Sequence, residues 1–155
     1  MTKTCIQYRA IIGATKDWNM NIDREGIRVL IVDDLPQVRH GLATVLELAG
    51  KAYKPKINIV GEAQNGSEAI EQAHILHPDV VLMDLEMPVL DGFTATQRIK
   101  LTNPSILIVA LSIHSDLASR QKAIQAGADA FIEKGAPLEE LLQAIQAIHG
   151  YKKTT

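Results

Sequence analysis

The stretch that decides the fold is residues 80–92, which read V-V-L-M-D-L-E-M-P-V-L-D-G. Its first four residues form an unbroken apolar run, which is typical of a central parallel strand that is buried on both faces. The run ends at Asp84. The sequence therefore predicts a buried strand that presents a carboxylate where it ends.

Similar runs lie on either side of this one, separated by longer segments with helical spacing. The predicted strands are Arg28–Val32, Ile57–Glu62, Val80–Met83, Ile106–Leu111 and Ala130–Glu133. Strands that alternate with helices form parallel sheets, because each crossover returns the chain to the same edge. A chain of 155 residues, 46% of them hydrophobic, is long enough for one such domain.

The predicted helices carry their own signals. Asp34 and Asn65 each have a glutamine or glutamate three residues later and resemble helix N-caps. Pro137 suits the first turn of the last helix. The apolar face of that helix is spaced at i, i+3, i+4 and i+7, and its residues are Leu138, Leu141, Leu142, Ile145 and Ile148.

Two regions have weaker patterns. The helix near Ser115–Ala126 has only Leu117 and Ile124 as large apolar residues on its stripe, so we expect it to be loosely held. Residues 1–26 show no clear period, and we place them in an N-terminal extension that docks through Trp18 or is partly disordered. Residues 27–150 form the predicted domain, and residues 151–155 a C-terminal tail.

Composition excludes several classes of protein. A net charge of −2 with 22% charged residues fits a globular protein and gives no bulk charge for binding nucleic acid. The single cysteine, Cys5, cannot form an internal disulfide, which favours a reducing cytoplasm. The longest apolar run, Ile106–Leu111, is far shorter than the roughly 20 residues of a membrane span. We also find no export signal.

Polar residues with complementary chemistry follow the predicted strands. They are Asp33, Asp34, Asp84, Ser112 and Lys134. In open α/β sheets the ligand site lies at the carboxyl ends of the strands, so these side chains are expected to converge. Clustered carboxylates repel one another unless a hard cation lies among them, and Mg²⁺ prefers such oxygens.

A carboxylate can also be the nucleophile of phosphoryl transfer and form an aspartyl phosphate. Asp84 is the candidate because it follows the central strand. Mg²⁺ on Asp33 and Asp34, with the Lys134 ammonium and the Ser112 hydroxyl opposite, would neutralise the charge of the phosphoryl group. Each residue taken singly has an ordinary structural explanation as a cap, turn or surface residue. Their joint occurrence at the strand ends favours the site.

Other functions were weighed against this one. A Mg²⁺-dependent phosphatase or hydrolase would need a substrate pocket and a second acid or base, and no His or Glu is placed for that role. The histidines, scattered without metal-ligand spacing, are His40, His74, His77, His114 and His149. Phosphate-binding G-x-x-x-x-G-K-[ST] and G-x-G-x-x-G loops are missing. Flavin phosphate would be repelled by the acidic pair Asp33-Asp34.

Residues 27–150 resemble the receiver domain of bacterial two-component response regulators. The strings that carry the resemblance are I-R-V-L-I-V-D-D, V-V-L-M-D-L-E-M-P-V-L-D-G and A-G-A-D-A-F-I-E-K. The resemblance implies a flavodoxin-like (CheY-like), doubly wound sheet of five parallel strands in the order 2-1-3-4-5, with five helices. The segment A-F-I-E-K-G-A-P-L-E-E-L-L-Q-A-I is most similar to receivers that precede a LuxR/FixJ-type effector.

The resemblance also implies a mechanism. Asp84 would accept a phosphoryl group from a sensor histidine kinase or a phosphotransfer protein. Mg²⁺ would bind Asp34, Asp84 and the backbone carbonyl of Glu86, with Asp33 acting through water. Ser112 and Phe131 would be the switch residues, changing the surface of the fourth helix, fifth strand and fifth helix.

That surface is where the resemblance places a homodimer or effector contact. We expect no direct binding of nucleic acid or membrane by this chain, and no enzymatic turnover beyond weak self-phosphorylation and autodephosphorylation. The alternative is a receiver-like protein-binding module that works without phosphorylation.

Two departures from the family pattern concern the site. Gly135 follows Lys134 where many receivers have proline, so no cis peptide is expected there. Ile113 is bulkier than the residue that many relatives place beside the phosphate.

Overall fold

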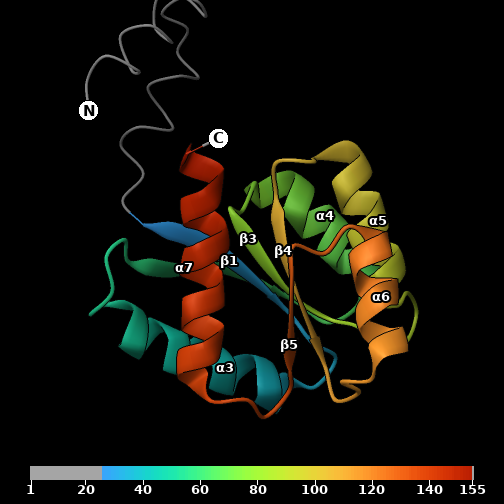
Figure 1. Cartoon of the computed structure of the whole chain (residues 1–155), viewed down its shortest axis with the longest axis horizontal. Helices are drawn as coiled ribbons and strands as arrows, with labels where there is room; N and C mark the ends of the chain where they lie inside the picture. Colours follow the sequence, from blue (N-terminus) through green and yellow to red (C-terminus); the bar gives the residue numbers. More distant parts are fainter. Residues whose placement is uncertain (1–25, 155) are drawn as a thin grey trace, which may run out of the picture.

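The chain folds into a five-stranded parallel sheet with the strand order β2-β1-β3-β4-β5 (Figure 1). The structure is a computed structural model, and it describes residues 26–154, with side chains to residue 150. The strands are β1 (Ile27–Val32), β2 (Ile57–Ala63), β3 (Val80–Asp84), β4 (Leu107–Ser112) and β5 (Ala130–Glu133). The predicted strands and their order are confirmed, with ends that differ by one residue.

A helix follows each strand. The helices are α3 (Pro36–Gly50), α4 (Gly66–Leu76), α5 (Gly92–Thr102), α6 (Leu117–Ala126) and α7 (Leu138–Thr154). Helices α3 and α7 pack on one face of the sheet, and α4 and α5 pack on the other. Helix α6 packs beside β5. The last helix continues past Gly150, where we placed the end of the domain, to Thr154.

The central strands are buried on both faces, as their apolar runs predict. In β1, Val29 and Ile31 belong to the core under α3 and α7, whereas Leu30 and Val32 belong to the core under α4 and α5. Every residue of β3 is buried. Because successive strand side chains point to opposite faces, a sheet covered on both sides requires apolar residues at every position.

Helix α7 matches its predicted amphipathic pattern. Leu141, Leu142 and Ile145 are buried in the core, and Leu138 and Ile148 pack against them. The helix begins directly after Pro137, whose carbonyl accepts a hydrogen bond from the Glu140 N–H.

The predicted apolar stripe of α6 is wrong. Leu117 and Ile124 are 70% and 64% exposed, and the buried residue of this helix is Ala123. Ala123 packs with Leu85 and Ala110. The methyl side chain of Ala123 lets α6 approach the sheet but buries little apolar area. The contact that attaches α6 to the sheet is therefore made by Ala123 and not by Leu117 and Ile124.

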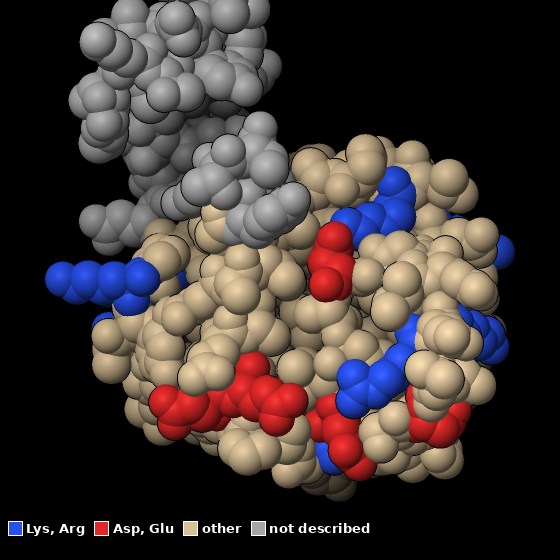
Figure 2. All heavy atoms as spheres, viewed as in Figure 1, with Lys and Arg blue, Asp and Glu red and all other residues tan. Residues whose placement is uncertain are grey.

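The charge distribution agrees with the sequence. On the face shown in Figure 2, acidic and basic side chains are interspersed. No helix of the described residues is long and apolar enough to cross a membrane. The predictions for Cys5, Trp18 and the rest of residues 1–25 lie outside the part of the chain that the structure describes.

Candidate functional site

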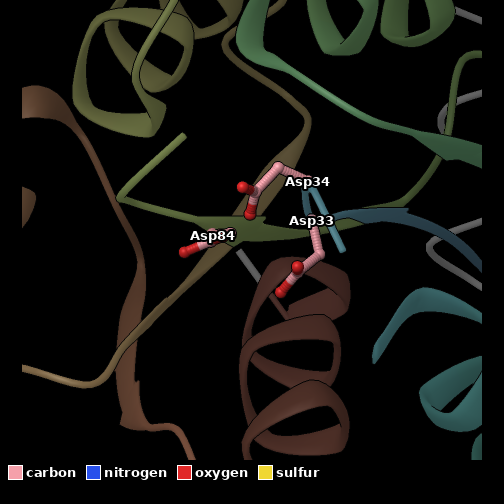
Figure 3. A group of neighbouring side chains, drawn as sticks. All are labelled: Asp33, Asp34 and Asp84. Carbon is pink, nitrogen blue, oxygen red and sulfur yellow. The ribbon is translucent and has the colours of Figure 1, made fainter. Parts of the chain in front are cut away.

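Three carboxylates meet at the carboxyl edge of the sheet (Figure 3). Asp33 and Asp34 follow β1, Asp84 ends the neighbouring strand β3, and one oxygen of each lies within 4.8 Å of the others. Asp33 and Asp84 are only 2% and 1% exposed. The convergence predicted from the strand ends is therefore present.

Lys134 pairs with two of these carboxylates. Its Nζ lies 2.8 Å from Oδ2 of Asp33 and 3.1 Å from Oδ1 of Asp84. Burial alone would lower the pKa of the Lys134 ammonium, but the hydrogen bond to Asp33 and the charge of Asp84 outweigh it, so the pKa is raised. A permanently charged cation thus lies beside the candidate nucleophile.

The two oxygens of Asp84 differ in their surroundings. Oδ1 accepts a hydrogen bond from the Glu86 N–H at 3.2 Å and also contacts Lys134, whereas buried Oδ2 has no hydrogen-bond partner among the described residues. Burial raises the pKa of Asp84 from 3.8 to about 6, although the Lys134 charge opposes the shift. A buried carboxylate oxygen without a donor is costly unless a cation pairs with it.

The donor set fits Mg²⁺. Three carboxylates with one unpartnered buried oxygen supply the hard oxygen ligands and the negative charge that this cation requires. Lys134 neutralises only part of that charge. The cluster therefore suits a divalent cation better than it suits a purely structural role.

Asp34 does not cap a helix, and that prediction is wrong. The N-cap of α3 is Leu35, without a side-chain cap, and Pro36 begins the helix. The Leu35 N–H instead binds Oδ1 of Asp33 at 2.9 Å. Because this local turn and the proline start the helix, the Asp34 carboxylate stays with the acidic cluster. The Asn65 cap is confirmed, since its side chain accepts from the Glu68 N–H at 2.9 Å.

Arg39 supports the acidic pair and was missed from the sequence. Its Nη1 donates to the backbone carbonyl of Asp33 at 2.7 Å, and its Nε donates to Glu62 at 3.2 Å. Its position on α3 gives no signal of this role, because Glu62 belongs to β2 and is brought near by strand pairing. The turn that carries Asp33 and Asp34 is thus tied to both neighbouring elements.

Ser112 is the last residue of β4 and lies on the other side of Asp84. Strand pairing sets Asp84 opposite Leu111, the residue before Ser112. Ser112 is fully buried, and its hydroxyl donates to Oε1 of Glu86 at 3.0 Å while accepting from the His114 N–H at 3.0 Å. The sequence predicts a role only for the backbone carbonyl of Glu86, so the contact of its side chain with Ser112 is a feature that the sequence did not predict.

Phe131 occupies β5 beside α6. Its half-buried ring packs with Leu85 and Ala123, and the Arg120 guanidinium lies 4.8 Å from the ring centre. Such a cation–π contact is worth about 0.5–1 kcal/mol when exposed. The ring is therefore held by weak contacts at its outer side.

The loop from β3 to α5 approaches Asp84 closely. A Cβ atom on Gly92 would lie 2.0 Å from the Asp84 carbonyl oxygen, so only glycine fits at this position. Asp91 caps α5 by accepting from the Thr94 N–H at 2.8 Å. This packing fixes the backbone of the candidate nucleophile.

The structure places Gly135 and Ile113, the two residues that depart from the receiver pattern. Gly135 has φ of 91°, a conformation that favours glycine, and the cis bond within the described residues is Lys54–Pro55 rather than the bond after Lys134. Ile113 is 61% exposed beside the site.

A cavity of about 470 Å³ lies next to Lys134, between α3 and α7. Most of its lining is apolar, and includes Val38, Val45 and Leu138. Val38 and Val45 are themselves 39% and 42% exposed. The cavity is therefore an apolar groove beside the acidic cluster.

Comparisons with known proteins agree with this geometry. Response regulator receiver domains, as a family, match residues 29–146. The response regulator GacA of Pseudomonas viridiflava is 38% identical over 122 residues, which are 79% of this chain and 55% of GacA. The chain thus spans about half the length of the curated relatives it matches.

Solved structures match over a similar range. A LuxR-family two-component response regulator from Aurantimonas sp. SI85-9A1 superposes with a TM-score of 0.73 at 33% identity, covering 81% of this chain and 86% of that one. A CheX–CheY–BeF3–Mg+2 complex from Borrelia burgdorferi gives a TM-score of 0.64 at 27% identity, covering 79% of this chain and 88% of that one.

Proposed function

The chain belongs to the response regulator receiver family of two-component systems, and from this premise we propose that Asp84 is its phosphoacceptor. The observation that carries the proposal is the buried, unpartnered Oδ2 of Asp84 in a cluster with Asp33, Asp34 and Lys134. The donor is a phosphohistidine on a sensor histidine kinase or phosphotransfer protein.

The transfer needs only positioning and charge. A carboxylate oxygen of Asp84 forms the new bond to phosphorus while the bond from phosphorus to the donor breaks, and the donor leaves with the bonding electrons. Lys134, already 3.1 Å from Asp84, neutralises the developing charge, and the Ser112 hydroxyl can donate to a phosphoryl oxygen.

Asp34, Asp84 and the backbone carbonyl of Glu86 would hold Mg²⁺, with Asp33 acting through water. The bound cation would supply the positive charge that lets an anionic donor approach an anionic acceptor. The CheX–CheY complex noted above contains both BeF3 and Mg+2, which supports the same pairing of a phosphoryl mimic and metal here.

The apolar groove between α3 and α7 supports a protein as phosphodonor. It opens beside Lys134 and exposes Val38 and Val45, which a partner helix can cover. A partner docked there would present its phosphohistidine next to Asp84. The single cysteine and the family both favour a cytoplasmic location for this encounter.

The output follows from the weak contacts of α6 and Phe131. The phosphoryl group carries about −1.5 to −2 charge in place of the single charge of the carboxylate, which draws the Ser112 hydroxyl and Lys134 toward it. We propose that the surface of α6, β5 and α7 then changes and controls homodimerisation or an effector, regulating transcription or another signalling output. Hydrogen exchange should show altered protection of α6 and Phe131 on adding beryllofluoride, whereas changes confined to the Asp84 loops would contradict this.

A phosphorylation-independent binding module is not favoured, because every residue needed for phosphoryl transfer is present and gathered. A hydrolase is not favoured either, because response regulator receiver domains, a family of signalling domains, match residues 29–146. Turnover is expected to be limited to slow self-phosphorylation from small donors and slow loss of the phosphoryl group.

The test is modification by acetyl phosphate or beryllofluoride, measured by mass spectrometry and calorimetry. The wild type should be modified in Mg²⁺, and Asp84→Ala or removal of Mg²⁺ with EDTA should abolish the signal. Asp116→Asn is the matched control, because the exposed Asp116 carboxylate binds Ser119 rather than a residue of the cluster, and asparagine also caps well. Equal modification of the wild type and Asp84→Ala would refute the proposal.

A further inference from the structure

The side chain of Glu86 makes a contact that the proposed reaction does not use. Glu86 lies two residues after Asp84, and its backbone N–H donates to Oδ1 of Asp84 at 3.2 Å. Its carboxylate turns to the other side and accepts the hydroxyl of Ser112 at 3.0 Å. One residue therefore bridges the phosphoacceptor and the hydroxyl proposed to bind the phosphoryl group.

The Ser112 hydroxyl has one proton to donate. In the described structure that proton goes to Glu86, while the oxygen accepts from the His114 N–H at 3.0 Å. A phosphoryl group on Asp84 needs the same proton. Binding of the Ser112 hydroxyl to Glu86 and to the phosphoryl group is therefore mutually exclusive.

The backbone of Ser112 cannot move far to serve both acceptors. It is fully buried at the end of β4, and its carbonyl accepts from the Lys134 N–H at 2.8 Å. Only rotation of the side chain can redirect the hydroxyl. Glu86, by contrast, is 40% exposed, so its release costs little packing.

We propose that the Glu86 carboxylate is a positioning residue that holds the Ser112 hydroxyl away from Asp84 until a phosphoryl group competes for it. This inference rests on the proposed function of Asp84. Both acceptors are anions, so both bonds are charge-assisted, and the balance between them sets how strongly phosphorylation drives the switch. The Glu86 side chain thus lowers the response of the unphosphorylated chain by acting on Ser112, whereas the contact of Glu86 with Asp84 is made by its backbone N–H.

The test compares two substitutions of Glu86. Glu86→Ala removes the acceptor and the charge, whereas Glu86→Gln removes the charge but keeps an acceptor oxygen. We expect beryllofluoride with Mg²⁺ to bind Glu86→Ala about three- to tenfold more tightly than it binds Glu86→Gln, measured by calorimetry. Since Glu86 is partly exposed, both variants should remain folded.

The same comparison in a Ser112→Ala background isolates the hydrogen bond. There the two Glu86 variants should bind beryllofluoride equally, because no hydroxyl is left to release. Glu133→Ala, which removes a carboxylate at the β5 position paired with Ser112, measures the effect of charge alone. If Glu86→Ala and Glu86→Gln bound beryllofluoride equally tightly while Ser112 is present, the inference would be overturned.

A second measurement does not need the phosphoryl mimic. The amide resonance of residue 114 reports the position of the Ser112 hydroxyl that it binds. It is measured in a His114→Ala background, because Nε2 of the His114 ring lies 3.8 Å from Oε1 of Glu86 and would respond to the loss of that carboxylate directly. It should shift in Glu86→Ala and much less in Glu86→Gln, and an unchanged resonance in Glu86→Ala would overturn the contact. Failure of the proposed function has a different signature, because wild type and Glu133→Ala would then bind no beryllofluoride, and the inference would fall with it.

Discussion

Two halves of the site are held in different ways. The acceptor half consists of Asp33, Asp84 and Lys134, which are joined by ion pairs of 2.8 and 3.1 Å, with both carboxylates buried. The switch half consists of Ser112, Glu86, Phe131 and α6. The contacts that hold its movable groups include a hydrogen bond from the buried Ser112 hydroxyl to a partly exposed carboxylate and a cation–π pair at 4.8 Å.

The helices beside β5 repeat this difference. Helix α7 adjoins the Lys134 loop and buries Leu141, Leu142 and Ile145, whereas α6 buries only Ala123. Chemistry requires atoms held in place, and a switch requires an element that moves at small cost. The comparison indicates that one domain provides both by giving its two halves unequal amounts of buried surface.

The largest expected difference is in the free energy of unfolding when one leucine is removed from each helix. Leu142→Ala, at 3% exposed, should destabilise the domain by about 2–5 kcal/mol because it leaves a cavity in the core. Leu117→Ala, at 70% exposed, should change it by less than about 0.5 kcal/mol. Urea denaturation measures both, and equal losses would break the comparison.

The backbone next to Asp84 leaves no room for a Cβ atom on Gly92. Gly92→Ala places a methyl group against the Asp84 carbonyl and should cost about 1–3 kcal/mol or more while weakening beryllofluoride binding. Gly41→Ala is the matched control, because no atom lies within 4 Å of the added Cβ, and alanine favours the helix by about 1 kcal/mol. A Gly92→Ala protein with unchanged stability and binding would show that this half can adjust.

Burial of the Asp84 carboxyl should make the stability of the acceptor half depend on pH. The folded pKa of Asp84, about 6, lies above its ordinary value of 3.8, so the folded state binds this proton more tightly. The protonated Asp84 carboxyl therefore contributes fully to the stability of the folded state below about pH 4, and this contribution is lost as the pH rises through 6. Without Mg²⁺, Asp84→Asn should therefore be more stable than the wild type at pH 7, on the order of 2 kcal/mol.

That advantage should shrink as the pH falls from 7 to 4, because the wild-type carboxyl becomes neutral too. Thermal or urea unfolding across this range in EDTA measures it. If the free energies of unfolding of Asp84→Asn and the wild type differed by the same amount at every pH, the buried charge of Asp84 would not destabilise the folded domain.

The smallest effect should come from helix caps. Asn65 caps α4 and Asp116 caps α6, each accepting from an N–H three residues later at 2.9 Å. Replacement of Asn65 by alanine should remove about 1 kcal/mol of stability, and replacement of the fully exposed Asp116 should act on the first turn of α6. We expect Asn65→Ala to lower global stability, and Asp116→Ala to increase hydrogen exchange mainly within α6. A purely global loss in Asp116→Ala would show that α6 unfolds only with the whole domain.

Much of this architecture was predictable from the sequence because it depends on local pattern. Apolar runs predicted the strands and are unbroken over four to six residues in β1, β3 and β4, and the spacing of Leu138 to Ile148 predicted the buried face of α7. The residues after those runs predicted the acidic cluster, since parallel strands deliver their carboxyl ends to one edge. These inferences needed only the order of the residues and the geometry of a parallel sheet.

Other features depended on partners that are distant in the chain. Lys134 reaches Asp33 across 101 positions, and Arg39 reaches Glu62 only because β1 and β2 pair. Helix α3 begins at Pro36 with Leu35 as its N-cap, so Asp34 does not cap it. Leu117 is exposed, and α6 instead contacts the sheet through Ala123. The sequence thus determined the strands, the buried face of α7 and the chemistry of the site. Only the tertiary structure decided which side chains meet there, because strand order and register bring together residues whose separation in the chain carries no signal of contact.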